Sequence, residues 1–207
     1  MIPPRTALSD TVAATVQTAA TTGVVLVLVA ALVGTVLALR LRGPALAWIP
    51  LGGVAAAFLL TGLGAVAAPA PVALLVATLA FALAILGGGP AVLLTLDLAT
   101  ADARAGVHGG IMIAAPRPAT AAPTAIGQPI EVLRGGTTIG LLERLATAGA
   151  LMSGIPEGVA VVVAVKGVGR FSELASPEAR ERFIIGTLAS LAWAAALGVL
   201  GRIYLTG

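Results

Sequence analysis

The chain has 207 residues, of which 58% are hydrophobic and 10% are charged, and its mean hydropathy is +1.06. Ordinary soluble domains are about 45–50% apolar and about 25% charged, so this composition excludes a water-soluble globular fold. The net charge of +3 is not gathered into the basic patch that nucleic-acid binding needs. Because there is no cysteine, disulfides and thiolate chemistry are excluded as well. We therefore expect an integral membrane protein that contacts lipid and does not bind nucleic acid.

The first apolar stretch, roughly residues 18–39, predicts a membrane-spanning helix that ends at Arg40 and Arg42. A polar, threonine-rich segment precedes it. No small-residue cleavage site follows the stretch, so we expect a retained span and not an export signal.

Two more spans are predicted before residue 100. The second, roughly residues 45–67, begins near Trp48, a residue type favoured at the lipid–water interface. The third runs from residue 72 towards residue 96, and its "GGGP" at 87–90 is expected to kink or end the helix.

Residues 97–136 differ in composition from the rest of the chain. They mix charges with a Pro-, Ala- and Thr-rich run, "APRPATAAPTAIGQP". Such a segment cannot bury enough apolar surface to order itself, which predicts a mobile loop. The apolar pattern resumes at residue 137, so we expect one membrane domain over 1–207 whose C-terminal part, 137–207, is a pair of helical segments.

The first segment of that pair is interrupted at Gly154, Pro156 and Gly158. In one interpretation it is a single kinked crossing of about 29 residues, one of five spans. In the other, the chain dips into the membrane and returns, which leaves four crossings and brings every cationic loop to the cytoplasmic side. The sequence alone leaves both interpretations open.

The last span is predicted from Pro177 to about Leu205, with Ser176 as N-cap. Small residues recur along it every four positions, which allows another helix to approach closely in lipid. We expect this stripe to be a helix-packing face formed by Gly186, Ser190, Ala194 and Gly198.

Charges cluster around the interrupted segment. Glu143 and Arg144 are expected near the lipid headgroups, and Lys166 and Arg170 are expected to snorkel to the interface. Glu157 is the costly charge, because a carboxylate deep in lipid must be paired or hydrated. It is either an ion, proton or polar-substrate site, or a structural carboxylate held by a cation of this chain. Arg182 and Arg202 are the available partners from another segment, whereas Arg144 or Lys166 could reach it only if the chain folds back at Pro156.

Three blocks of the C-terminal third, "LRGGTTIGLLERL", "PEGVAVVVAVKGVGRFSEL" and "ERFIIGTLASLAWA", resemble a family of small bacterial integral membrane proteins of unknown function, common in actinobacteria. The resemblance implies a bacterial inner-membrane location and no particular activity. Mapped onto this chain, its signature includes Phe171 and Thr187 together with a balanced charged cluster of Glu143, Arg144, Glu157, Lys166, Arg170, Glu173, Glu181 and Arg182.

No recognisable catalytic, cofactor-binding or metal-binding motif occurs in the sequence. The leading functional hypothesis is therefore a non-enzymatic, multi-pass inner-membrane protein that assembles with itself or with a membrane-protein partner. The alternative is a small transporter or an ion- or proton-conducting protein that uses Glu157 at the helix break.

Overall fold

The computed structural model describes residues 5–41, 44–64, 68–99, 111–113, 130–132, 136–170 and 177–207. Almost all of these residues are helical, which confirms the predicted all-α class. The helices are α1 (Arg5–Leu41), the short 3-10 helix η1 (Pro44–Ala47), α2 (Trp48–Gly62), α3 (Ala70–Ala99), α4 (Gly136–Ser153), α5 (Glu157–Arg170) and α6 (Pro177–Thr206). Two three-residue strands, β1 (Ile111–Ile113) and β2 (Ile130–Val132), pair antiparallel.

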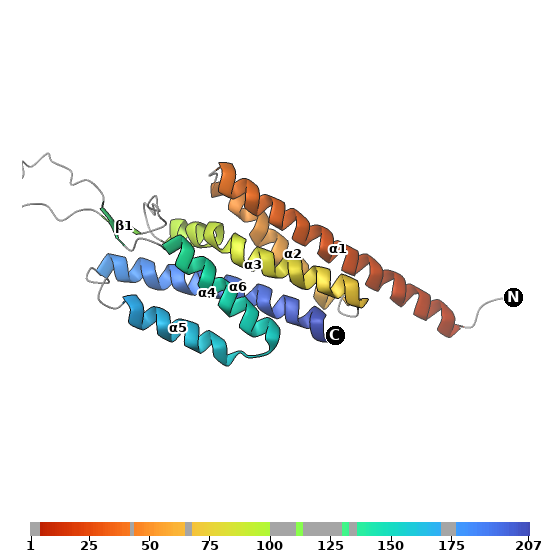
Figure 1. Cartoon of the computed structure of the whole chain (residues 1–207). Coiled ribbons are helices and arrows are strands. Elements are labelled where there is room, and N and C mark those ends of the chain that lie inside the picture. Colours follow the sequence, from red (N-terminus) through yellow and green to blue (C-terminus); the bar gives the residue numbers. More distant parts are fainter. Residues whose placement is uncertain are drawn as a thin grey trace, which may run out of the picture.

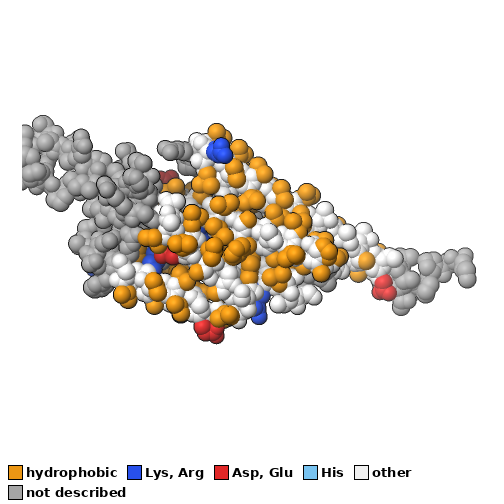
Figure 2. All heavy atoms as spheres, in the orientation of Figure 1, with side chains coloured by type: hydrophobic (Ala, Val, Ile, Leu, Met, Phe, Trp, Pro, Cys, Tyr) orange, Lys and Arg blue, Asp and Glu red, His pale blue; other side chains and the backbone are white. Residues whose placement is uncertain are grey.

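Four helical segments are long and apolar enough to cross a membrane, so the protein is a multi-pass membrane protein. They are Ser9–Leu41, Ala45–Gly62, Ala70–Ala99 and Arg180–Thr206. Large apolar side chains remain exposed on them, such as Leu26, Leu59 and Leu188. Figure 2 shows hydrophobic side chains spread over the visible face of the bundle, as expected of a surface that lipid covers.

The chain reverses direction between α4 and α5, so the interpretation of one kinked crossing is wrong and the fold-back is correct (Figure 1). Lys166 Nζ lies 2.5 Å from Glu143 Oε2. On a continuous helix these residues would be about 35 Å apart, because each residue advances about 1.5 Å. The two helices form a hairpin, which replaces the fifth crossing.

Local chemistry explains why the chain turns there. Gly154 has a φ of +77°, a left-handed conformation that glycine adopts at little cost and that commonly ends helices. The amide of Ile155 donates to the carbonyl of Ala150 at 2.8 Å, which satisfies a terminal carbonyl of α4. Pro156 then cannot continue the helix, and Glu157 begins α5 with its carboxylate at the positive end of the helix dipole.

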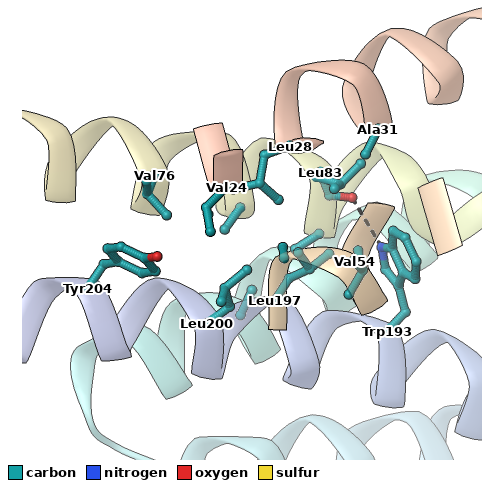
Figure 3. Close-up of a cluster of buried hydrophobic side chains, with 14 of the residues drawn as sticks. Val24, Leu28, Ala31, Val54, Val76, Leu83, Trp193, Leu197, Leu200 and Tyr204 are labelled. Carbon is teal, nitrogen blue, oxygen red and sulfur yellow. Dashed lines mark hydrogen bonds between the residues drawn. The ribbon is translucent and has the colours of Figure 1, made fainter. Parts of the chain in front are cut away.

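The core lies where α3 and α6 pack together, with α1 and α2 on one side and α4 on the other (Figure 1). Its largest fully buried side chains are aliphatic and come from α1, α3 and α6: Val24, Leu28, Val76, Leu83, Leu197 and Leu200 (Figure 3). The indole of Trp193 closes one end of this cluster, and its Nε1 donates a hydrogen bond to the carbonyl of Leu83 at 3.1 Å.

The boundaries of two predicted elements need correction. α3 does not end at residues 87–90; it continues through Pro90 to Ala99. Asp97 therefore belongs to a helix, and the predicted loop 97–136 also contains β1, β2 and, at Gly136, the first residue of α4. The remainder of that predicted loop lies outside the described residues. The last helix starts at Pro177 as predicted and ends at Thr206.

Candidate functional site: a buried charge cluster

A cluster of polar side chains is buried where α4 meets α3 and α6. Two adjacent α4 residues of opposite charge, Glu143 and Arg144, are 8% and 6% exposed. Thr147, one turn further along α4, is fully buried. The sequence placed Glu143 and Arg144 near the headgroups; the structure shows them inside the bundle.

Lys166 reaches Glu143 from the opposite arm of the hairpin. Their side chains are 15% and 9% exposed, and the Nζ–Oε2 distance is 2.5 Å. The ammonium also lies 5.5 Å from the centroid of the Phe183 ring on α6, within range of a cation–π attraction. Lys166 therefore points inward, so the prediction that it snorkels is wrong, and its two contacts tie α5 to α4 and to α6.

Arg144 occupies a space made by glycines. A Cβ at Gly88 of α3 would overlap the Arg144 side chain, and a Cβ at Gly140 of α4 would lie 3.0 Å from its Nη1. The guanidinium donates from Nε to the carbonyl of Ile85 at 2.9 Å and from Nη1 to Ser190 Oγ at 3.3 Å. Its charge is thus held by neutral acceptors on α3 and α6, with the Glu143 carboxylate on the next residue.

The glycines of the "GGGP" sequence in α3 make room for side chains at the interface of α3 with α4 and α6. A Cβ at Gly87 would lie 2.6 Å from the Trp193 ring, so this glycine makes room for the indole as Gly88 makes room for Arg144. Gly89 has no atom within 4 Å of the corresponding position. Two of the three glycines are therefore required by side chains from α6 and α4.

The small-residue stripe of α6 lies against helices of the same chain. Gly186 faces Val92 and Leu96 of α3, and Ser190 is the buried acceptor for Arg144. Ala194 is fully buried. A Cβ at Gly198 would lie 3.1 Å from the Ala148 carbonyl oxygen of α4. The stripe thus packs α6 onto α3 and α4.

Glu157 lies apart from the buried cluster. It is exposed in the first turn of α5, at the tip of the hairpin. Within the described part of the chain it forms no ion pair, so the predicted pairing with Arg182 or Arg202 is wrong there. Arg202 instead lies with its guanidinium against Gly154. Glu157 does lie at the helix break, and the alternative function that uses it there, a transporter or conducting protein, stays a prediction.

The remaining predicted site residues are dispersed. Arg182 is buried near the start of α6. Glu181 is exposed and helps to line an open hollow of about 310 Å³ formed by Pro177, Arg180, Glu181, Ile184 and Ile185. Arg170 ends α5, although its side chain is not among those described, and Glu173 lies outside the described residues.

The cluster is suited to holding helices together. One carboxylate, one ammonium and one guanidinium meet in an apolar bundle, where each polar contact is strengthened by the low dielectric. Sequence reasoning singled out all three charged residues but missed the acceptors of Arg144, which are the Ile85 carbonyl and Ser190 Oγ, and the role of Gly88. The spacing of "GGGP" within a long apolar stretch was the available signal, because small residues in membrane helices mark close contacts.

No family model, curated protein or solved structure matches this chain. The resemblance of the C-terminal third to a bacterial membrane family therefore stays a prediction.

We predict that Glu143 and Lys166 are energetically coupled. Glu143→Gln and Lys166→Met each leave one buried charge without its partner, and each should lower the free energy of unfolding by about 3 kcal/mol. The variant carrying both changes should lose much less than the sum, as measured by thermal or denaturant unfolding in detergent. Additive losses would contradict the ion pair.

A second prediction compares neighbouring glycines. Gly88→Ala should lower stability by about 1–3 kcal/mol, because the new methyl group displaces the Arg144 side chain. Gly89→Ala is the matched control and should be neutral or stabilising by up to about 1 kcal/mol, since its Cβ meets open space and alanine favours helix. Equal melting temperatures for the two variants would show that Arg144 does not occupy the Gly88 position.

Proposed function

We propose that this protein is a non-enzymatic subunit of the bacterial inner membrane that assembles with a protein partner outside the cytoplasm through the N-terminal part of α1. The bacterial location rests on the sequence resemblance described above. The assembly role rests on one observation: α1 extends far beyond the bundle that the other described helices form (Figure 1).

The distribution of charge supports the orientation. Arg40, Lys166 and Arg180 lie towards the end of the bundle where α1 and α5 finish and α6 begins. In the sequence, the segments that connect helices at this end add Arg42, Arg104, Arg117 and Arg134. At the opposite end, the charged residues near the helix ends are Arg5, Asp10, Glu157 and Arg202. Because positive residues favour the cytoplasm, the first end faces inward.

The extended part of α1, Ser9–Ala20, is hereafter the α1 extension. None of its side chains is buried, whereas α1 buries Thr21, Val24, Leu28 and Ala31 directly afterwards. Near its C-terminal end, α2 contacts α1 at Gly23, where an added Cβ would lie 3.2 Å from Leu60 Cδ1. Among the described residues, the other helices thus cover α1 from Ala20 onward, where Ala20 is partly buried against the core, and they bury no side chain of residues 9–19.

With the α1 extension, α1 exceeds the length that a membrane crossing needs. A helix crosses a hydrocarbon core about 30 Å thick in about 20 residues, so the span that ends at Leu41 begins near Thr21. The α1 extension then projects about 18 Å past the core, through the headgroups and into water. Its two valines and three threonines have lower helix propensity than its four alanines, and its single charge cannot form i,i+4 ion pairs within it. A protein partner would supply the missing stabilisation.

The test is the mass of the protein purified from membranes in mild detergent. We expect a complex heavier than one chain, which Val12→Lys together with Val16→Lys reduces to a single chain without lowering the melting temperature of the bundle. Thr15→Lys together with Thr18→Lys, on another face of the same helix, is the control and should keep the complex. A single-chain mass for the unchanged protein would overturn the proposal.

A further inference from the structure

We infer that the partner of the α1 extension is a second copy of this chain, and that the two extensions pack in parallel through a stripe formed by Val12, Val16 and Ala19. This inference rests on the proposed function and names the occupant of the same surface. The stripe is exposed: Val12 and Val16 are 56% and 53% accessible, and Ala19 is exposed as well.

The stripe continues an interface that already exists within the chain. Val12, Val16, Ala19 and Gly23 follow the i, i+4, i+7, i+11 spacing of one helix face. At Gly23 that face is covered by Leu60 of α2. Because α2 ends at Gly62, the same face lacks its covering helix over the α1 extension. A second helix laid along Val12 and Val16 would continue the packing that α2 begins.

A second face of the same helix is formed by threonines, and this face does not need a partner to cover it. Thr11, Thr15, Thr18 and Thr22 follow the same spacing about 100° away around the helix axis. The hydroxyls of Thr15, Thr18 and Thr22 donate to the carbonyls four residues earlier, at 2.7–2.8 Å. With these donors satisfied inside the helix, the threonine face can stay in water while the valine stripe is buried.

The single charge of the α1 extension does not prevent two copies from packing through their valine stripes. The α1 extension has one ionisable residue, Asp10, and helix geometry places it about 150° around the axis from the centre of the valine stripe. Two copies packed through the stripe would keep their aspartates on outer sides, so no like charges face each other. A stripe without charge also offers nothing for an oppositely charged partner protein to recognise.

Membrane orientation then fixes the register. Every copy inserts with its cationic end in the cytoplasm, so the α1 extensions of two copies point the same way. A closed pair has a two-fold axis, which here must run along the membrane normal, and equivalent residues lie at equal height. Val12 would therefore lie against Val12 of the second copy, and Val16 against Val16.

Single cysteines test this arrangement cleanly because the chain has none of its own. Val12→Cys and Val16→Cys, and separately the controls Thr15→Cys and Thr18→Cys, would be made in two co-expressed copies with different epitope tags. Membranes would be oxidised with copper phenanthroline. We expect a disulfide-linked species carrying both tags for the valine positions, at least fivefold more abundant than for the threonine positions.

Each of the other outcomes overturns the inference, and one of them overturns the proposed function as well. Equal linkage at valine and threonine positions would show random collision and overturn the inference. A complex heavier than one chain that contains no species with both tags would place a different protein on the α1 extension, which overturns the inference but leaves the proposed function standing. A single-chain mass together with no linkage would overturn both.

Discussion

The ion pair between Lys166 and Glu143 is the constraint on which the rest of this structure depends. The two residues are separated by 23 positions, and they can meet only if the chain reverses between Ser153 and Glu157. Breaking a buried pair strands a charge in a medium that solvates it poorly, so the reversed chain is strongly preferred over an extended one. This reversal makes the number of crossings four.

The number of crossings in turn sets the orientation. With α4 and α5 forming a hairpin, α6 begins at the same end of the bundle where α1 finishes, so the cationic segments need not be divided between the two sides of the membrane. Arg144 is held in the same region by Ile85 and Ser190, and Gly88 gives it room. The buried charge of Arg144 therefore needs the space at Gly88, and the hydrogen bonds of Arg144 in turn hold α4 close to α3 and α6.

Much of the fold could be predicted from the sequence, because it follows from local composition. Few charges and long apolar stretches indicate membrane helices, and Pro177 and Gly154 mark a helix start and a helix end through backbone chemistry that involves near neighbours alone. The position of the chain break was predictable for this reason. The angle between the two arms was not, because it depends on a pair of residues distant in sequence.

The candidate site was predicted less well for the same reason. Hydropathy identifies a charge in an apolar segment as costly but cannot show which charge finds a partner, so Glu157 was singled out although Glu143 is the buried carboxylate. Gly87 and Gly88 were interpreted as helix breakers because the side chains they accommodate, Trp193 and Arg144, come from other helices. The α1 extension could be recognised in the sequence as a threonine-rich segment, but only the structure shows where the other helices stop packing against α1.

The most direct test of the reversal is a disulfide between Ala150→Cys and Gly158→Cys. A Cβ at Gly158 would lie 2.9 Å from Ala150 Cβ, close to disulfide geometry after a small shift. On a continuous helix the two residues would be about 12 Å apart, beyond bridging distance. The account predicts near-complete intramolecular bond formation on oxidation in membranes, with Ala150→Cys and Gly167→Cys remaining reduced as the control. Two free thiols in the Ala150–Gly158 variant would contradict the fold-back.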